Sequence, residues 1–111
     1  MRIPISKLYY LRTQEDISLI LSGVRALIGE ITPPLRSVSI ELDNKKVIFK
    51  CVFDQTATDD DIELMSAVAG EIIADFPDYD LKEIYQKIPQ PEPTNPLKNV
   101  LYHRHENNYW K

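Results

Sequence analysis

The residues of this chain that could bind a metal are few and lie far from other ligands. His103 and His105 are two positions apart, so their imidazole rings would lie on one face of a strand, as some metal sites require. A zinc site needs a third and usually a fourth ligand, and the sequence offers one cysteine and no further histidine. We therefore expect no metal and no cofactor, and interpret the two histidines as part of a polar strand face.

Three consecutive acids, Asp59, Asp60 and Asp61, could suggest a site for a hard cation. In a helix, however, consecutive side chains point about 100° apart and cannot converge on one ion. Thr58 precedes the acids, and a threonine followed by acidic residues is typical of a helix N-terminus, where the helix dipole favours negative charge. We interpret these residues as the start of a helix.

Catalysis by a nucleophile or by paired carboxylates has no support in the sequence. Cys51 lies in an alternating pattern with Phe49 and Phe53, which predicts a buried and unreactive thiol. No serine or histidine has the spacing of a nucleophile elbow. Scattered carboxylates alone do not identify an acid–base site, because their distances in space are unknown. We therefore expect a protein that is not an enzyme.

The cellular compartment is predicted from the cysteine content and from the apolar runs. A lone cysteine cannot form an internal disulfide, which fits a reducing compartment. The N-terminal residues show no export signal, and charged residues interrupt every apolar run well before the roughly 20 residues that span a bilayer. We expect a cytoplasmic protein that makes no contact with a membrane.

The first half of the chain contains a helix pattern followed by two strand patterns. Thr13 is a suitable N-cap, and Gly29 supplies a helix stop. Between them, apolar residues recur at helical spacing: Ile17, Ile20, Leu21, Val24, Leu27 and Ile28. Alternating apolar residues over 37–42 and 47–53, separated by a polar turn, then predict a β-hairpin.

The second half predicts one further helix and two weaker strands. The helix begins after Thr58 and ends before Pro77. Strand patterns over 79–88 and 98–105 flank a proline-rich segment, which we expect to be an extended linker. The whole order predicts an α+β fold, with two helices packed on one face of an antiparallel sheet of about four strands. A chain of 111 residues has the length of a single domain.

The distribution of charge is more informative than the net charge of −4. Between Asp54 and Glu83 there are ten acidic residues and one basic residue. The negative electrostatic field of these acidic residues repels phosphate backbones, so we expect no direct binding of nucleic acid. A solvated helix face is often charged, but an ordinary one mixes both signs to form pairs along the helix. The imbalance therefore favours a surface that attracts a basic protein.

Three stretches between Leu27 and the end of the sequence are informative about its family: Leu27-Ile28-Gly29-Glu30-Ile31-Thr32-Pro33-Pro34-Leu35-Arg36-Ser37-Val38-Ser39, Phe53-Asp54, and Glu71-Ile72-Ile73-Ala74-Asp75-Phe76-Pro77. Through these stretches the sequence resembles small bacterial immunity proteins of contact-dependent growth inhibition and polymorphic toxin systems. The stretch that ends in Ala-Asp-Phe-Pro is the most specific. These motifs are not catalytic, so the resemblance concerns fold and role.

The resemblance implies that the protein binds and neutralises a cognate toxin domain, such as a basic nuclease, by covering its active site or substrate groove. Combined with the charge imbalance, it leads to a hypothesis for the toxin contacts, with tyrosines as aromatic anchors. The hypothesised residues are Asp59, Asp60, Glu63, Glu71, Asp75, Asp78, Asp80, Tyr79 and Tyr85. A regulatory or adaptor domain that binds a basic host protein is the alternative. Aromatic residues near the termini (Tyr9, Tyr10, Tyr109 and Trp110) could also serve a homodimer.

Overall fold

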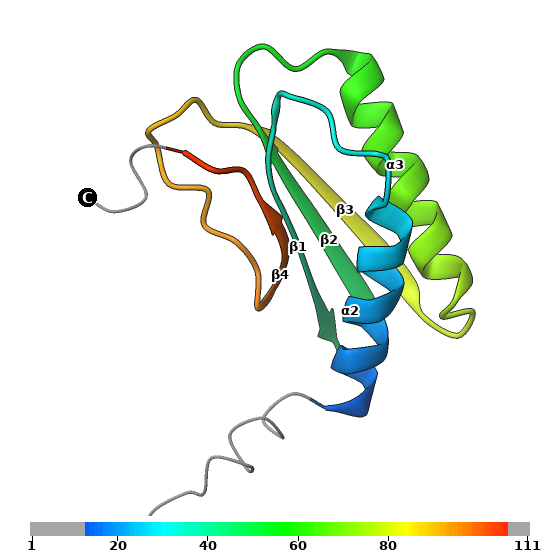
Figure 1. The fold of residues 1–111 in the computed structure, drawn as a ribbon. Helices are drawn as coiled ribbons and strands as arrows, with labels where there is room; N and C mark the ends of the chain where they lie inside the picture. Colours follow the sequence, from blue (N-terminus) through cyan, green and yellow to red (C-terminus); the bar gives the residue numbers. More distant parts are fainter. Residues whose placement is uncertain (1–12, 107–111) are drawn as a thin grey trace, which may run out of the picture.

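The computed structural model (Figure 1) describes residues 13–106, so the terminal aromatic residues suggested for a homodimer lie outside it. Six elements follow one another along the chain: α2 (Gln14–Leu27), β1 (Leu35–Asp43), β2 (Lys46–Phe53), α3 (Asp59–Ala74), β3 (Asp80–Lys87) and β4 (Asn99–His103). The predicted α+β class and the predicted order of elements are confirmed. Both helices lie on the same face of the four-stranded sheet.

The sheet has the strand order β3-β2-β1-β4 and is mixed, so the prediction of a wholly antiparallel sheet is wrong. β1 pairs antiparallel with β2 and with β4, but β2 pairs parallel with β3. The reason is the connection, because α3 runs back along the sheet between β2 and β3. A strand that follows such a crossover helix starts again from the same end of the sheet and runs parallel to the first strand.

The hairpin of β1 and β2 forms as the alternation predicts. Asp43 pairs with Lys46 across a two-residue turn. Asn44 in this turn has a φ of 57°, a left-handed conformation that asparagine tolerates better than most residues. Val47, Phe49, Cys51 and Phe53 face the helices and are fully buried, together with Val38 and Ile40 of β1. These side chains form the centre of the core.

α2 begins as predicted but buries a different face. The backbone N–H of Asp16 donates to Thr13 Oγ1 at 3.0 Å, and Gly29 follows the helix with a φ of 78°. The buried positions of α2 are Asp16, Leu19, Ser22, Gly23, Ala26 and Leu27, so most of the apolar stripe predicted from Ile17 to Ile28 is exposed. Small side chains allow this face to approach the sheet closely. A Cβ atom on Gly23 would lie 2.5 Å from Leu101 Cδ1 of β4.

The proline-rich segment between β3 and β4 is more than a linker, because it packs across the sheet face opposite the helices (Figure 1). Lys50 points away from the helices, and its Nζ donates to the carbonyl of Asn95 at 2.6 Å. The backbone N–H of Leu97 donates to Ser39 Oγ at 2.9 Å. Ser39 and Lys50 are therefore buried although they lie on the outer face of the sheet.

Candidate functional site

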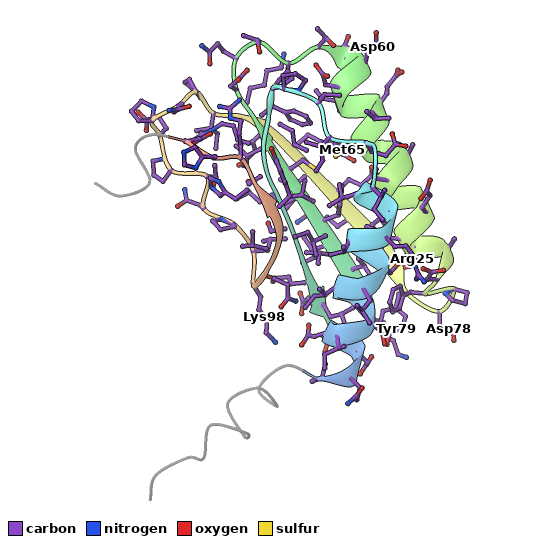
Figure 2. The ribbon with its side chains drawn as sticks, in the orientation of Figure 1. Arg25, Asp60, Met65, Asp78, Tyr79 and Lys98 are labelled. Carbon is purple, nitrogen blue, oxygen red and sulfur yellow. The ribbon has the colours of Figure 1, made fainter. Side chains whose placement is uncertain are left out.

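The acidic residues of the predicted site lie on the outside of α3 and on the turn that follows it. α3 directs Met65, Val68, Ala69 and Ile72 into the core, which leaves the acids on the solvent side. All seven predicted acidic residues are exposed. Figure 2 shows Asp60 and Asp78 at opposite ends of this surface, with Met65 directed toward the sheet.

The seven acids form two groups rather than one patch. Asp59, Asp60 and Glu63 lie at the N-terminal end of α3, and Glu71, Asp75, Asp78 and Asp80 lie at its C-terminal end and in the turn. A helix of 16 residues separates the two ends by about 24 Å. Asp61, which the prediction left out, accepts hydrogen bonds from the Thr58 backbone N–H at 2.8 Å and from Thr32 Oγ1 at 2.9 Å. These bonds lower the pKa of Asp61.

Basic residues from other parts of the chain lie close to the C-terminal group. Arg25 of α2 approaches Asp75, and Lys45 and Lys46 of the hairpin lie near Tyr79 and Asp80, respectively. By contrast, no ion pair to the N-terminal group (Asp59, Asp60 and Glu63) is formed within residues 13–106. The excess of negative charge that the sequence predicts is therefore stronger around the N-terminal group than around the C-terminal group, where bases from other segments offset it.

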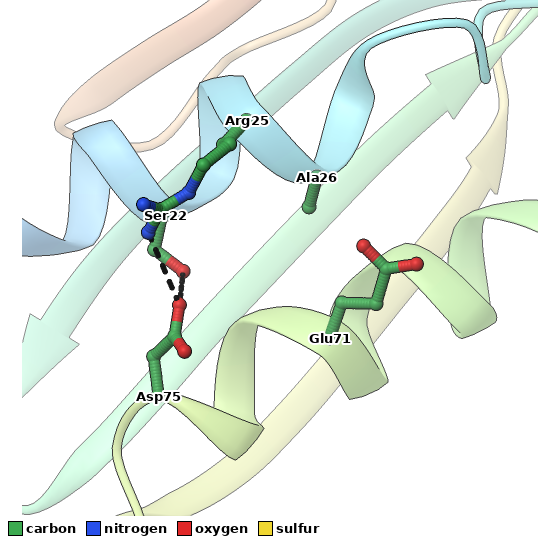
Figure 3. Close-up of a pocket in the computed structure, with 5 residues that line it drawn as sticks. All are labelled: Ser22, Arg25, Ala26, Glu71 and Asp75. Atoms are coloured by element: carbon green, nitrogen blue, oxygen red, sulfur yellow. Dashed lines mark hydrogen bonds and ion pairs between the residues drawn. The ribbon is translucent and has the colours of Figure 1, made fainter.

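A polar groove of about 300 Å³ lies between α2 and α3 (Figure 3). Ser22, Arg25 and Ala26 line one side, and Glu71 and Asp75 line the other. Ser22 Oγ donates to Asp75 Oδ2 at 2.6 Å, and Arg25 Nη2 lies 3.5 Å from the same oxygen. Arg25 and Asp75 are both largely exposed, so water screens this ion pair. The groove places two of the predicted acids next to each other, within reach of a cationic side chain.

The two tyrosines of the predicted site have different environments. Tyr79 Oη donates to the Glu15 carboxylate at the start of α2, and this hydrogen bond raises the pKa of the tyrosine. Lys45 Nζ lies 4.9 Å from the centre of the Tyr79 ring, a cation–π contact. Tyr85 is half-buried in β3 against the core, burial raises its pKa, and its hydroxyl donates to Glu83. Tyr79 is thus tied to the turn beside the acids, whereas Tyr85 also belongs to the packing of the sheet.

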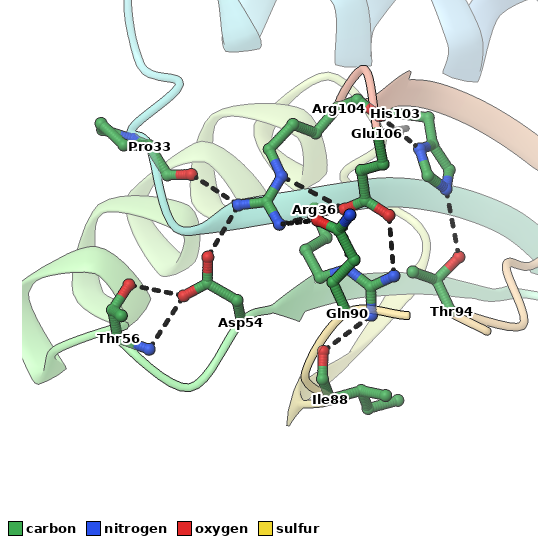
Figure 4. A network of polar contacts seen from close by, with 10 residues as sticks. All are labelled: Pro33, Arg36, Asp54, Thr56, Ile88, Gln90, Thr94, His103, Arg104 and Glu106. Carbon is green, nitrogen blue, oxygen red and sulfur yellow. Dashed lines mark hydrogen bonds and ion pairs between the residues drawn. The ribbon is translucent and has the colours of Figure 1, made fainter. Parts of the chain in front are cut away.

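A buried polar network at the other end of the sheet was missed by the prediction (Figure 4). Arg36 Nε and Nη2 donate to the two carboxylate oxygens of Glu106 at 2.8 and 2.9 Å, and Arg36 Nη1 donates to the Ile88 carbonyl at 2.7 Å. Arg104 Nη1 lies 2.7 Å from Asp54 Oδ2, and its Nη2 lies 3.0 Å from Glu106. The network pairs two cations with two anions.

The network shifts the titration of its acids. Hydrogen bonds from Arg36 hold the pKa of Glu106 below its ordinary value. Burial raises the pKa of Asp54, but hydrogen bonds from Arg104 and Thr56 outweigh burial and lower it. Arg36 and Asp54 both lie in the stretches that carry the family resemblance, and this was the one signal in the sequence that pointed to them. Their contacts indicate a role in holding the fold together.

The structure also shows where the residues considered for metal binding and nucleophilic chemistry lie. Cys51 is fully buried, and burial raises the pKa of its thiol. His103 closes β4, its Nδ1 lies 2.9 Å from the Arg104 carbonyl, and burial lowers its pKa. His105 lies beyond the strand. In the described part of the chain, no group of three histidine, cysteine or acidic residues could hold a metal ion, and no helix there is long and apolar enough to cross a bilayer.

Comparison with known protein families gives a match that covers most of the chain. The sequence over residues 16–106 matches the model of a family described as MafI2 immunity protein. The matched region includes most of α2 and every later element through the Glu106 of the buried network. No curated protein matches the chain.

Proposed function

The chain belongs to the MafI2 immunity protein family, and from this premise we propose that it neutralises a cognate toxin domain with nuclease activity by binding to it. The family match is the observation that supports neutralisation of a toxin. The acidic surface of α3 supports a basic toxin, because a nuclease that binds phosphate backbones carries a positive groove. The encounter would take place in the cytoplasm, where the nucleic acid substrate of such a toxin is found.

The N-terminal group of acids is the strongest candidate for long-range attraction of the toxin. Asp59, Asp60 and Glu63 are exposed and are not neutralised by an ion pair within the described residues. Clustered charges of one sign speed the encounter with an oppositely charged partner and set its orientation. These acids would meet the cations that otherwise hold the phosphates of the substrate.

The C-terminal group would supply closer contacts. Asp75 and Glu71 line the groove between the helices, and the exposed Arg25–Asp75 pair is weak enough for an incoming lysine or arginine to replace Arg25. Tyr79 lies beside this group, held by Glu15 and Lys45. Asp78 and Asp80 flank Tyr79 in the sequence, so that turn presents an aromatic ring between two carboxylates.

The first experiment is to purify the tagged protein from cells that also express the genes next to its own. We expect a basic toxin domain in a one-to-one ratio that survives moderate salt, and we expect the purified pair to lack nuclease activity. Recovery of a basic host protein instead would favour the adaptor alternative. Recovery of no partner, together with normal growth of cells that lack the protein, would contradict the proposal.

A matched pair of variants tests which surface binds. Asp60→Asn with Glu63→Gln changes the charge by +2 on α3, and Glu92→Lys makes the same change at an exposed position in the segment between β3 and β4. We expect the first variant to bind the toxin at least tenfold more slowly at low salt, and the second to bind like the wild type. Equal association rates for the two variants would remove the N-terminal group from the interface.

A further inference from the structure

The outer face of α2 is unusually apolar for an exposed helix. Ile17, Leu21 and Val24 are 37, 63 and 47% exposed, and Ile28 and Ile31 just beyond the helix are 74 and 43% exposed. The opposite face of α2 is also apolar and packs on the core through Leu19 and Leu27, among others. A helix that is apolar on both faces is normally buried on both faces. The exposed residues, which we call the α2 seam (Ile17, Leu21, Val24, Ile28 and Ile31), therefore have the composition of an interface.

The α2 seam extends from the helix into the segment that follows it. Ile17, Leu21 and Val24 are spaced four and three residues apart and lie on one face of α2, and Ile28 at the C-cap and Ile31 continue the apolar surface past the end of the helix. Between Asp16 and Glu30 the only charged residue is Arg25, and Arg25 turns toward Asp75 on α3 (Figure 3). The seam itself contains no charge.

An apolar pocket of about 200 Å³ lies at the C-terminal end of the seam. Val24, Ile28 and Ile31 of the seam line it, together with Leu27, Gly29 and two residues of β4, Leu101 and Tyr102. A pocket of this size accepts one branched apolar side chain. The α2 seam thus offers both projecting apolar side chains and a hollow beside them, so a second copy of the same surface can match its shape.

We propose that the α2 seam is the interface of a homodimer, in which the seams of two copies of this chain pack against each other. Each copy carries a net charge of −4, so two copies meet at the lowest electrostatic cost through a face without charge. The α2 seam is such a face. A two-fold axis would bring identical surfaces together, so that the side chains of one seam fill the pocket of the other copy.

The same charge distribution argues against the toxin as the occupant of the α2 seam. The acids that would attract a basic protein lie on α3 and the following turn, and α3 packs against the side of α2 that carries Ser22 and Arg25. The exposed seam lies on a different side of the helix. A dimer through the seam therefore leaves the acids of both copies accessible, and one dimer would bind two toxin domains.

The test measures the mass of the full chain in solution by light scattering over a range of concentrations. We expect the wild type to have twice the mass of one chain at tens of micromolar and to dissociate on dilution. Leu21→Lys and Ile28→Lys place a charge in the seam and should each raise the dissociation constant at least tenfold. Ser18→Lys adds the same charge at an exposed position of the same helix outside the seam and should leave the dimer intact.

Circular dichroism spectra of the four proteins check that each variant is folded. Because both seam side chains are exposed, we expect the spectra of the monomeric variants to match that of Ser18→Lys. A wild type that is a monomer at every concentration would overturn the proposal, and so would a dimer that Ser18→Lys disrupts and the seam variants do not. If the wild type is a monomer and the seam variants lose toxin binding, the seam belongs to the toxin interface.

Discussion

Arg36 and Glu106 are 70 residues apart in the sequence and form a two-pronged ion pair, with both side chains 2% exposed. The pair joins the start of β1 to the chain beyond β4. Arg36 also donates to the Ile88 carbonyl, so one guanidinium group connects three segments of the chain. Removing Glu106 would leave the buried Arg36 with only the Ile88 carbonyl, whereas removing Arg36 would leave Glu106 with Arg104. Glu106 is therefore the more sensitive member of the pair.

Glu106→Ala should lower the free energy of unfolding by about 3–5 kcal/mol, because the Arg36 guanidinium then stays buried without its main partner. Urea denaturation measures this loss. Arg25→Ala, which breaks the exposed pair with Asp75, is the control and should cost less than about 1 kcal/mol. Replacing both partners, as Arg36→Met with Glu106→Leu, should be less harmful than Glu106→Ala. Equal losses for the buried and exposed pairs would contradict this account.

The stability of the protein should fall steeply in acid. Glu106, Asp54 and Asp16 all have a pKa below their ordinary values of 4.5, 3.8 and 3.8, so the unfolded chain binds protons that the folded chain excludes. Their stabilising contribution is complete above about pH 5 and is lost as the pH falls through the lowered pKa values. Denaturation at pH 7, 5, 4 and 3 measures the effect. Glu106→Gln should flatten the profile, and an unchanged profile would exclude Glu106 as a cause.

Gly23 and Gly70 should respond in opposite ways to substitution by alanine. Gly70 lies in α3 with no atom within 4 Å of an added Cβ, so Gly70→Ala should stabilise the protein by about 0.5–1 kcal/mol through helix propensity. Gly23→Ala would place a methyl group 2.5 Å from Leu101 Cδ1 and should destabilise the protein by about 1 kcal/mol. Thermal denaturation compares the two. In a Leu101→Ala background the effect of Gly23→Ala should become favourable, and the same penalty in both backgrounds would rule out the contact.

Cys51 should not react with thiol reagents while the protein is folded. Its side chain is fully buried, and burial raises the pKa of the thiol, so almost no thiolate is present at neutral pH. Alkylation with iodoacetamide at pH 8, followed by mass spectrometry, should show no adduct after one hour. The same treatment in urea should modify the whole sample. Rapid modification of the folded protein would indicate that β2 opens.

The sequence predicted most elements but not every contact between them. Capping residues such as Thr13 and the alternation around Phe49 are local signals, and both helices and the hairpin formed where those signals placed them. The direction of β3 was missed, because the two-residue period of a strand is the same whether its neighbour runs parallel or antiparallel.

The buried face of α2 was missed because both sides of the helix are apolar. Periodicity favoured the larger side chains such as Leu21, but the small ones such as Gly23 and Ala26 face the core. Close approach to Leu101 selects the small side, and Leu101 is nearly 80 residues away in the chain. The predicted acids lie on the surface as expected. The bases beside them, Arg25 and Lys45, were missed because they come from other segments, and counting the charges between residues 54 and 83 does not include them.

The bond between Arg36 and Glu106 also determines when a newly made chain can complete its fold. During synthesis the N-terminal residues emerge first, so β1 and β2 can pair while Glu106 has not yet been added. Arg36 gains the Ile88 carbonyl as a possible partner once residue 88 has been made, but it lacks its carboxylate partner until Glu106 is added. A partly made chain therefore carries an arginine without its carboxylate partner, and β1 is tied to the segment beyond β4 only after residue 106 has been added.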